Sequence, residues 1–232
     1  MKLYLYLFFF ASFFVSAQSN YEKGVALFDK EQYELAKEIF TNELLQSPSN
    51  QKIIEYLGDI ASHQNKWETA SLYYKKLTAL NPKNANYFFK YGGSLGMRAQ
   101  TEGKWVAICV VGDSKAALDK ALLLNPNHIE ARWALIEYYL QLPVFVGGSE
   151  TKAQRYANEL YKISPVDGCL AKAHIDEHYK RYKNAEVNYI KAIEVGGSKL
   201  TYDRLAQLYK EKFHDPDKAL KVLENYKKRN KT

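Results

Sequence analysis

The chain contains few of the residues that commonly form active sites. Its 232 residues include five histidines and two cysteines, a small pool for acid–base chemistry. No Ser–His–acid arrangement can be argued from the spacing. The glycine-rich run Gly92–Gly96 follows a helical pattern and lacks the Lys-Ser/Thr ending of a phosphate-binding loop. These absences predict that the protein is not an enzyme and has no cofactor.

Long apolar runs are also scarce, and the one that is present lies at the start of the sequence. Met1-Lys2 precedes an apolar run from Leu3 to Val15, which is followed by Ser16-Ala17-Gln18. A positive charge, a short apolar core and a small-residue exit are typical of a signal peptide. The run is shorter than the roughly 20 residues that span a bilayer. We therefore expect residues 1–17 to be a signal peptide and the protein to be exported, periplasmic or extracellular.

The remaining chain is expected to have no transmembrane segment, although association with the cell envelope stays open. Its charge is basic, with a formal value of +7 for the whole sequence. Basic residues cluster only near the C-terminus, at Lys227, Lys228, Arg229 and Lys231. Such a cluster is typical of a solvated terminus, and export argues against a nucleic-acid partner.

The strongest pattern is a repeat with a period of 34 residues. Six positions recur with matching type at this offset: Gly24, Tyr33, Ala36, Phe40, Pro48 and Asn50 correspond to Gly58, Trp67, Ala70, Tyr74, Pro82 and Asn84. This period predicts an array of helix–turn–helix units. Small residues let two helices approach, aromatic residues fill the space between them, and proline closes each unit.

The Gly–Tyr/Trp–Ala–aromatic–Pro pattern resembles the tetratricopeptide repeat (TPR) family. The resemblance implies an all-α, right-handed helical solenoid whose concave face is lined by the first helix of each pair. Anchored on the second-helix alanines, the pattern extends to about six units, near residues 18–50, 51–84, 85–128, 129–166, 167–198 and 199–232. The fourth unit is expected to close at Pro165, and Asn50 is a potential N-cap.

The third unit departs from the repeat because it carries about ten extra residues between Met97 and Ser114. Gly112-Asp113-Ser114 is interpreted as a turn and helix N-cap. The run from Trp105 to Val111 could be a strand in isolation, but in a helical array it is expected to be a buried helix. Cys109 and Cys169 fall in different units, which predicts two buried free thiols.

Pro143-x-x-x-Gly147-Gly148-Ser149-x-x-Lys152-Ala153 interrupts the fourth unit. It resembles a loop found in a subset of bacterial exported TPR proteins. Pro143 ends a helix, the two glycines allow dihedral angles closed to other residues, and Ser149 can cap the next helix. One interpretation is a wide structural turn. The other is a lip over the groove, in which exposed Val144, Phe145 and Val146 contact a ligand.

His174-Ile175-Asp176-Glu177-His178 matches the H-x-x-E-H motif of a class of zinc peptidases. On a helix, His174 and His178 would share a side with Glu177 near them. The segment lies in the first helix of a small repeat pair, with few residues left downstream for a third ligand. We therefore expect no metal site here, with His174, Glu177 and His178 as a weak candidate only.

The repeat frame indicates which first-helix residues face the groove. These candidates for partner binding are Tyr21, Lys52, Glu55, Asp59, Phe89, Arg98, Arg132, Trp133 and Glu137, with Pro143, Phe145, Gly147 and Gly148 in the loop. Aromatic residues with charges of both signs suit an amphipathic peptide or a protein segment. Cytosolic TPR proteins that clamp a C-terminal carboxylate use a set of lysine, asparagine and arginine residues on consecutive first helices. Here Glu55 and Asp59 beside Lys52 argue against such a clamp.

The sequence thus predicts an exported, non-enzymatic TPR scaffold that binds a protein or peptide in its concave groove. Two alternatives stay open. One is a small-ligand carrier, with a pocket between the extended third unit and the Gly-Gly loop, ringed by Trp105, Phe145 and Trp133. The other is a zinc hydrolase at the H-x-x-E-H segment.

Overall fold

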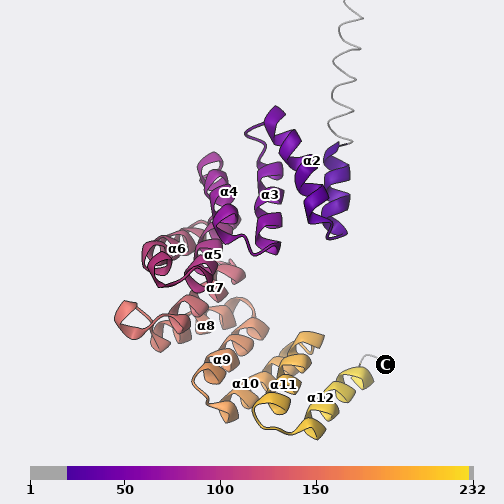
Figure 1. The fold of residues 1–232 in the computed structure, drawn as a ribbon. Helices are drawn as coiled ribbons and strands as arrows, with labels where there is room; N and C mark the ends of the chain where they lie inside the picture. Colours follow the sequence, from indigo (N-terminus) through magenta and orange to yellow (C-terminus); the bar gives the residue numbers. More distant parts are fainter. Residues whose placement is uncertain (1–19, 230–232) are drawn as a thin grey trace, which may run out of the picture. The chain divides into compact units, whose positions relative to one another are not determined.

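The computed structural model describes residues 20–229, and within this range the predicted all-helical fold is confirmed. Helices joined by short turns follow one another along the chain, and no strand occurs between residues 20 and 229 (Figure 1). The predicted signal peptide and Lys231 lie outside the described residues. The chain divides into two compact units, which meet in sequence between Leu124 and Asn125.

Each unit is a series of helices in which each packs against its neighbour in sequence. Unit 1 begins with a helix over residues 20–29 and continues with α2 (Tyr33–Gln46), α3 (Gln51–His63), α4 (Trp67–Leu80), α5 (Ala85–Thr101) and α6 (Lys104–Leu124). Unit 2 contains α7 (Ile129–Gln141), the 3₁₀ turn η1 (Val144–Val146), α8 (Glu150–Ile163), α9 (Pro165–His178), α10 (Tyr182–Val195), α11 (Lys199–Glu211) and α12 (Pro216–Arg229). Each of the six sequence units therefore contains one pair of helices.

The turn inside a pair is built on one left-handed residue. Glu31 and Asn65, 34 positions apart, have φ of 58° and 56°, and Lys180 and His214, also 34 apart, have φ of 58° and 54°. The Lys66 amide then donates to the Ala61 carbonyl at 2.8 Å, which closes the helix end. The repeat thus fixes the turn geometry as well as the core.

The repeated glycines mark positions where an aromatic ring of the second helix of a pair packs against the backbone of the first. A Cβ atom on Gly58 would lie 2.5 Å from the ring of Tyr74, and one on Gly24 would lie 2.8 Å from the ring of Phe40. In both pairs the partner is 16 residues further along the sequence. The pairing explains why glycine and an aromatic residue recur together, because the ring occupies the space of the missing side chain.

The extra residues of the third unit lengthen its two helices and do not form a loop. The turn is placed at Gly103, where φ is 96°, so that α5 and α6 both extend past their counterparts. The predicted turn at Gly112–Ser114 is therefore wrong, because these residues lie inside the continuous helix α6. The buried hydroxyl of Ser114 donates to the Gly92 carbonyl at 2.7 Å and ties the two helices together.

The expected burial of the Trp105–Val111 segment is also wrong, although the segment is helical. Trp105 is 84% exposed and Ile108 67% exposed, whereas Val110 is buried. The reason is that α6 buries one face, which Val110, Ser114, Ala117, Leu118 and Ala121 carry. Of the two cysteines, both free, Cys169 is buried as expected but Cys109 is exposed.

Helix caps agree with the sequence at two positions and differ at a third. The Asn50 side chain accepts from the amides of Lys52 and Ile53, and Ser149 caps α8. Pro165, expected to close the fourth unit, instead begins α9. Ser164 is both the C-cap of α8 and the N-cap of α9, and proline is favoured at the first position of a helix.

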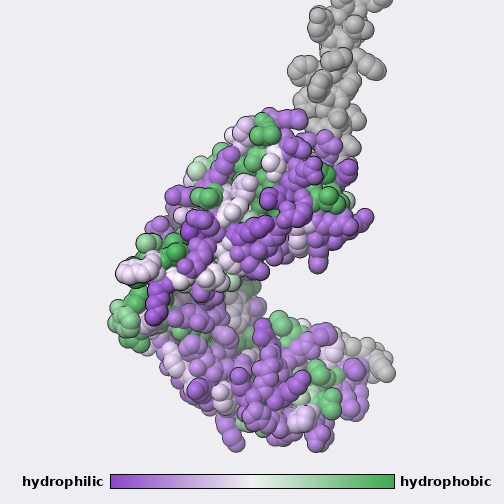
Figure 2. Space-filling view, viewed as in Figure 1, coloured by the Kyte–Doolittle hydropathy of each residue, from purple (hydrophilic) through white to green (hydrophobic). Residues whose placement is uncertain are grey.

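One face of the described residues is largely polar (Figure 2). On the face shown in Figure 2, hydrophilic residues predominate and apolar residues form small separate areas. Between residues 20 and 229, no helix combines the length and apolar character that a membrane span requires.

Candidate partner-binding site

A pocket of about 320 Å³ opens on the first-helix side of unit 1. It is lined by Tyr21 from the helix over residues 20–29 and by Lys52, Glu55, Tyr56 and Asp59 from α3. The four α3 positions follow the spacing i, i+3, i+4 and i+7, which places them on one face of the helix. Four of these five residues are predicted groove residues; Tyr56 is the addition.

Aromatic rings form one wall of the pocket. The rings of Tyr21 and Tyr56 meet edge to face with centroids 6.1 Å apart. Tyr56 also stacks on Phe40 at 4.8 Å and an interplanar angle of 12°. Burial raises the pKa of Tyr56, and the neighbouring Tyr21 and Asp29 raise it further. The phenol is therefore neutral at physiological pH, and its ring is held by packing.

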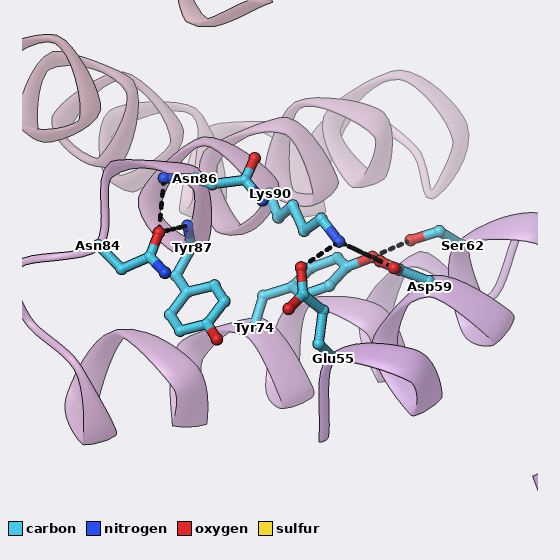
Figure 3. A network of polar contacts seen from close by, with 8 residues as sticks. All are labelled: Glu55, Asp59, Ser62, Tyr74, Asn84, Asn86, Tyr87 and Lys90. Atoms are coloured by element: carbon cyan, nitrogen blue, oxygen red, sulfur yellow. Dashed lines mark hydrogen bonds and ion pairs between the residues drawn. The ribbon is translucent and has the colours of Figure 1, made fainter. Parts of the chain in front are cut away.

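Two of the lining residues, Glu55 and Asp59, belong to an ionic network (Figure 3). Lys90 Nζ on α5 lies 2.6 Å from Glu55 Oε1, and 2.7 and 2.8 Å from the two carboxylate oxygens of Asp59. The Tyr74 hydroxyl donates to Asp59 Oδ1 at 2.7 Å. Burial, followed by the charge of Asp59, raises the pKa of Tyr74. The network joins α3, α4 and α5 and fixes the two carboxylates.

The pocket therefore combines an aromatic wall with carboxylates of fixed position. Two carboxylates share the single ammonium group of Lys90, whose three N–H donors are all used. Lys52 is exposed at the edge of the pocket. This arrangement can hold a polar ligand group beside an aromatic surface, but it contains no nucleophile paired with a base.

Tyr56 and Lys90 are the residues of the candidate site that sequence reasoning missed. They lie 34 residues apart, in equivalent positions of the second and third repeats, just as Glu55 is equivalent to Phe89. The helical spacing from Lys52 to Asp59 already contains the signal for Tyr56. The link between Lys90 and Glu55 has no such signal, because it depends on how α3 and α5 are placed on either side of α4 in sequence and brought within reach of the Lys90 side chain.

The other predicted residues of unit 1 do not line this pocket. Phe89 is half-buried on α5. Arg98, near the end of α5, donates to Glu102 at 2.9 Å and to Glu68 at 3.3 Å. Its guanidinium therefore links α5 to the start of α4.

In unit 2, Arg132 and Trp133 serve packing within the unit. Arg132, expected at an open groove position, is buried and lies 3.2 Å from Glu159 on α8. The indole nitrogen of Trp133 donates to Asp167 at 3.1 Å, and its ring packs against the core of the unit. The position of Arg132 differs from the expectation because its own helix pair supplies the carboxylate that a buried guanidinium needs.

Glu137 faces a histidine across two first helices, α7 and α9. His174 Nε2 lies 2.5 Å from Glu137 Oε1, the distance of an ion pair when the imidazole is protonated. The proximity of Glu137 raises the pKa of His174 against the opposing effect of burial. Burial acts to raise the pKa of Glu137, yet His174 lowers it overall. Each of the two shifts therefore favours the charged form of its group.

We expect an NMR titration to show this coupling directly. The pKa of His174 should lie above 6.5, and Glu137→Gln should lower it, because the favourable charge is removed while burial remains. Since a raised folded-state pKa stabilises the protein below the unfolded-state pKa, this contribution to stability is lost as pH rises through the folded-state value. A His174 pKa that is the same in both proteins would contradict this assignment.

The three side chains of the H-x-x-E-H motif have separate surroundings. His174 contacts Glu137, Glu177 accepts from the Tyr189 hydroxyl at 2.6 Å, and the His178 ring lies edge to face with Tyr179. Between residues 20 and 229, no three His, Cys, Asp or Glu side chains gather in a way that could hold a metal ion. His174 therefore contacts the preceding repeat, whereas Glu177 and His178 make their contacts within their own repeat.

The Pro143–Gly148 loop holds an apolar tip in solvent by a dense set of backbone hydrogen bonds. The Val146 and Gly148 amides donate to the Pro143 carbonyl at 2.9 and 3.1 Å, and Gly147 is left-handed with φ of 115°. A Cβ atom on Gly148 would lie 1.8 Å from the Leu142 carbonyl oxygen. Phe145 is 91% exposed. The two glycines are thus required by the turn itself.

These repeating helix pairs have the tetratricopeptide repeat fold, as comparison with solved structures also shows. The chain is similar to a thermophilic TPR protein from Thermus thermophilus (18% identity, 83% of this chain and 98% of that one, TM-score 0.65). It is also similar to a TPR protein from Parabacteroides merdae (18% identity, 90% of this chain and 78% of that one, TM-score 0.62). A third similar structure is YrrB, described as a TPR protein with an unusual peptide-binding site (16% identity, 78% of this chain and 87% of that one, TM-score 0.53).

At these identities the likeness concerns the fold. No family model and no curated protein matches the sequence. Resemblance of the Pro143–Ala153 segment to a loop of exported TPR proteins therefore stays a prediction.

Proposed function

We propose that the protein is an exported, non-enzymatic TPR scaffold that binds a protein or peptide segment on the first-helix side of unit 1. The observation that carries this proposal is the pocket formed by Tyr21 and one face of α3. First-helix surfaces are where the TPR fold offers open side chains, and YrrB is a TPR protein described as having a peptide-binding site.

The composition of the pocket supports a peptide as the ligand. Tyrosine rings give a large contact area at a low cost in conformational entropy, and they are enriched at interfaces. Glu55 and Asp59 are fixed by Lys90 before any ligand arrives, which reduces the ordering cost of binding. The volume of about 320 Å³ suits one side chain of a longer segment rather than a whole folded partner.

The proposed export rests on the apolar run from Leu3 to Val15, which lies outside the described residues. Cleavage after Ala17 would leave Tyr21 close to the new N-terminus. Fractionation of the producing cells tests this part separately. The protein recovered from the exported fraction should lack residues 1–17, whereas an uncleaved cytoplasmic chain would contradict export.

A blocking experiment tests the pocket. Peptides selected from a random display library on the purified protein would be titrated against a Cys109→Ser variant that carries Lys52→Cys, with and without a bulky maleimide adduct. The adduct should weaken binding by about tenfold or more, because position 52 lies at the edge of the pocket. The same adduct at Lys76→Cys, on α4, should change little, since α4 contributes no residue to the pocket.

An equal loss of peptide binding with both adducts, or no loss with either adduct, would contradict the proposed site. Native mass spectrometry of the purified protein supplies the remaining comparison. A small molecule that co-purifies stoichiometrically, with no peptide selected by the display library, would contradict the peptide-binding proposal and favour a ligand carrier.

A further inference from the structure

We infer that the pocket of unit 1 recognises a basic side chain, arginine or lysine, on the bound peptide. This inference rests on the proposed function and adds the chemical class of the group that enters the pocket.

The network of Glu55, Asp59 and Lys90 has an excess of negative charge. Glu55 and Asp59 contribute two carboxylates, and Lys90 contributes one ammonium group at 2.6–2.8 Å from their oxygens. All three groups are mostly buried, with 20–27% of each side chain exposed. Solvent therefore screens the remaining charge less than it would at an open surface.

The carboxylates also keep capacity to accept further hydrogen bonds. An ionised carboxylate has about four acceptor positions. Asp59 Oδ2 receives one bond, from Lys90, while Oδ1 receives bonds from Lys90 and Tyr74. An arginine fork or a lysine ammonium that enters from the open side can therefore use positions that the internal network leaves unfilled.

The aromatic wall suits the same ligand group. Tyr21 and Tyr56 border the carboxylates, so the apolar stem of a long basic side chain could lie along the rings. Cations are attracted to the faces of such rings, and Lys90 already lies 5.7 Å from the centre of the Tyr74 ring. The open side of the pocket therefore offers a ligand cation carboxylate oxygens and tyrosine rings, the same kinds of groups that surround Lys90.

An anionic ligand group fits this pocket less well. It would have to approach Glu55 and Asp59, and the charge of Asp29 also acts on Tyr56. Lys52, the one basic residue among the five that line the pocket, is exposed, so its attraction is screened by solvent and salt. Because the negative groups Glu55 and Asp59 are mostly buried and the positive group of Lys52 is exposed, the pocket favours a cation.

The charge of the ligand group can be read from three matched peptides. Acetyl-Gly-Ala-X-Ala-Gly-amide, with X as arginine, citrulline or glutamate, would be titrated into the isotopically labelled protein and followed at the ring resonances of Tyr56. Citrulline keeps the shape of arginine without its charge. We expect the arginine peptide to bind about tenfold more tightly than the other two.

The variant Lys52→Ala gives a sign test that does not depend on disturbing the core, because Lys52 is exposed. Removing its positive charge should raise affinity for the arginine peptide about twofold to fivefold, while Lys76→Ala should leave it unchanged. Equal binding of arginine and citrulline peptides, or weaker binding by Lys52→Ala, would overturn the inference; so would the absence of binding by all three. If the adduct at position 52 still blocks display-selected peptides, the proposed function survives that failure.

Discussion

Gly168→Ala is expected to destabilise unit 2 by about 3 kcal/mol, measured by urea unfolding. Gly168 lies in the first turns of α9, and a Cβ atom there would be 2.3 Å from Tyr161 Cα and 2.5 Å from Tyr161 N. The obstacle is the backbone of α8, which cannot rotate away as a side chain could. Only Ser164 separates the two helices, so they cannot move apart without disturbing the caps of both.

The control for this prediction is an alanine at a helical glycine with open space around it. Gly93 in α5 has no neighbouring atom within 4 Å of the position that a methyl group would occupy, and alanine is favoured over glycine in a helix interior by about 0.5–1 kcal/mol. Gly93→Ala should therefore leave stability unchanged or raise it. Similar losses from both substitutions would show that close approach of α8 and α9 is not the cause.

Lys90→Met is expected to destabilise unit 1 by about 2–3 kcal/mol, less than for a fully buried pair because the groups keep some exposure. Methionine fills much of the same volume but removes the only cation that contacts both Glu55 and Asp59 in the described network. Two neighbouring carboxylates then remain without compensation. Guanidinium unfolding would be unsuitable, since its salt screens the repulsion; urea unfolding at low ionic strength measures it.

Neutral replacement of the carboxylates provides the test of that cause. Adding Glu55→Gln and Asp59→Asn to Lys90→Met removes the repulsion while keeping the shapes of the side chains. Most of the lost stability should return, because a buried ionic network can often be replaced by uncharged groups at little cost. Persistent destabilisation of the triple variant would mean that Lys90 contributes chiefly through packing.

The sequence predicted the helix pairs because their cause is local and repeated. Gly58 and Tyr74 recur with the same spacing as Gly24 and Phe40, and each such couple is one close contact between helices. The candidate pocket was largely predictable for the same reason, since Lys52, Glu55 and Asp59 share one face of a single helix.

The errors concern features that depend on neighbouring helices. An apolar run such as Trp105–Val111 does not reveal how many of its sides are covered, and α6 leaves Trp105 in solvent. The spacing of Arg132 predicts a residue that faces the groove, but its side chain is buried beside Glu159, which lies on the next helix. Lys90 likewise became part of the site only because its side chain reaches from α5 to Glu55 and Asp59 on α3.

The central claim is that the Tyr21–α3 pocket contacts the partner, and photo-cross-linking in the producing cells tests it most directly. The photoreactive residue p-benzoylphenylalanine would replace Lys52 in one variant and Lys76 in the other. Mass spectrometry would then identify the linked segment. We expect a cross-linked segment that carries arginine or lysine next to the point of attachment, formed from position 52 and not from position 76. Equal cross-linking from the two positions, or cross-linking from position 76 alone, would contradict it.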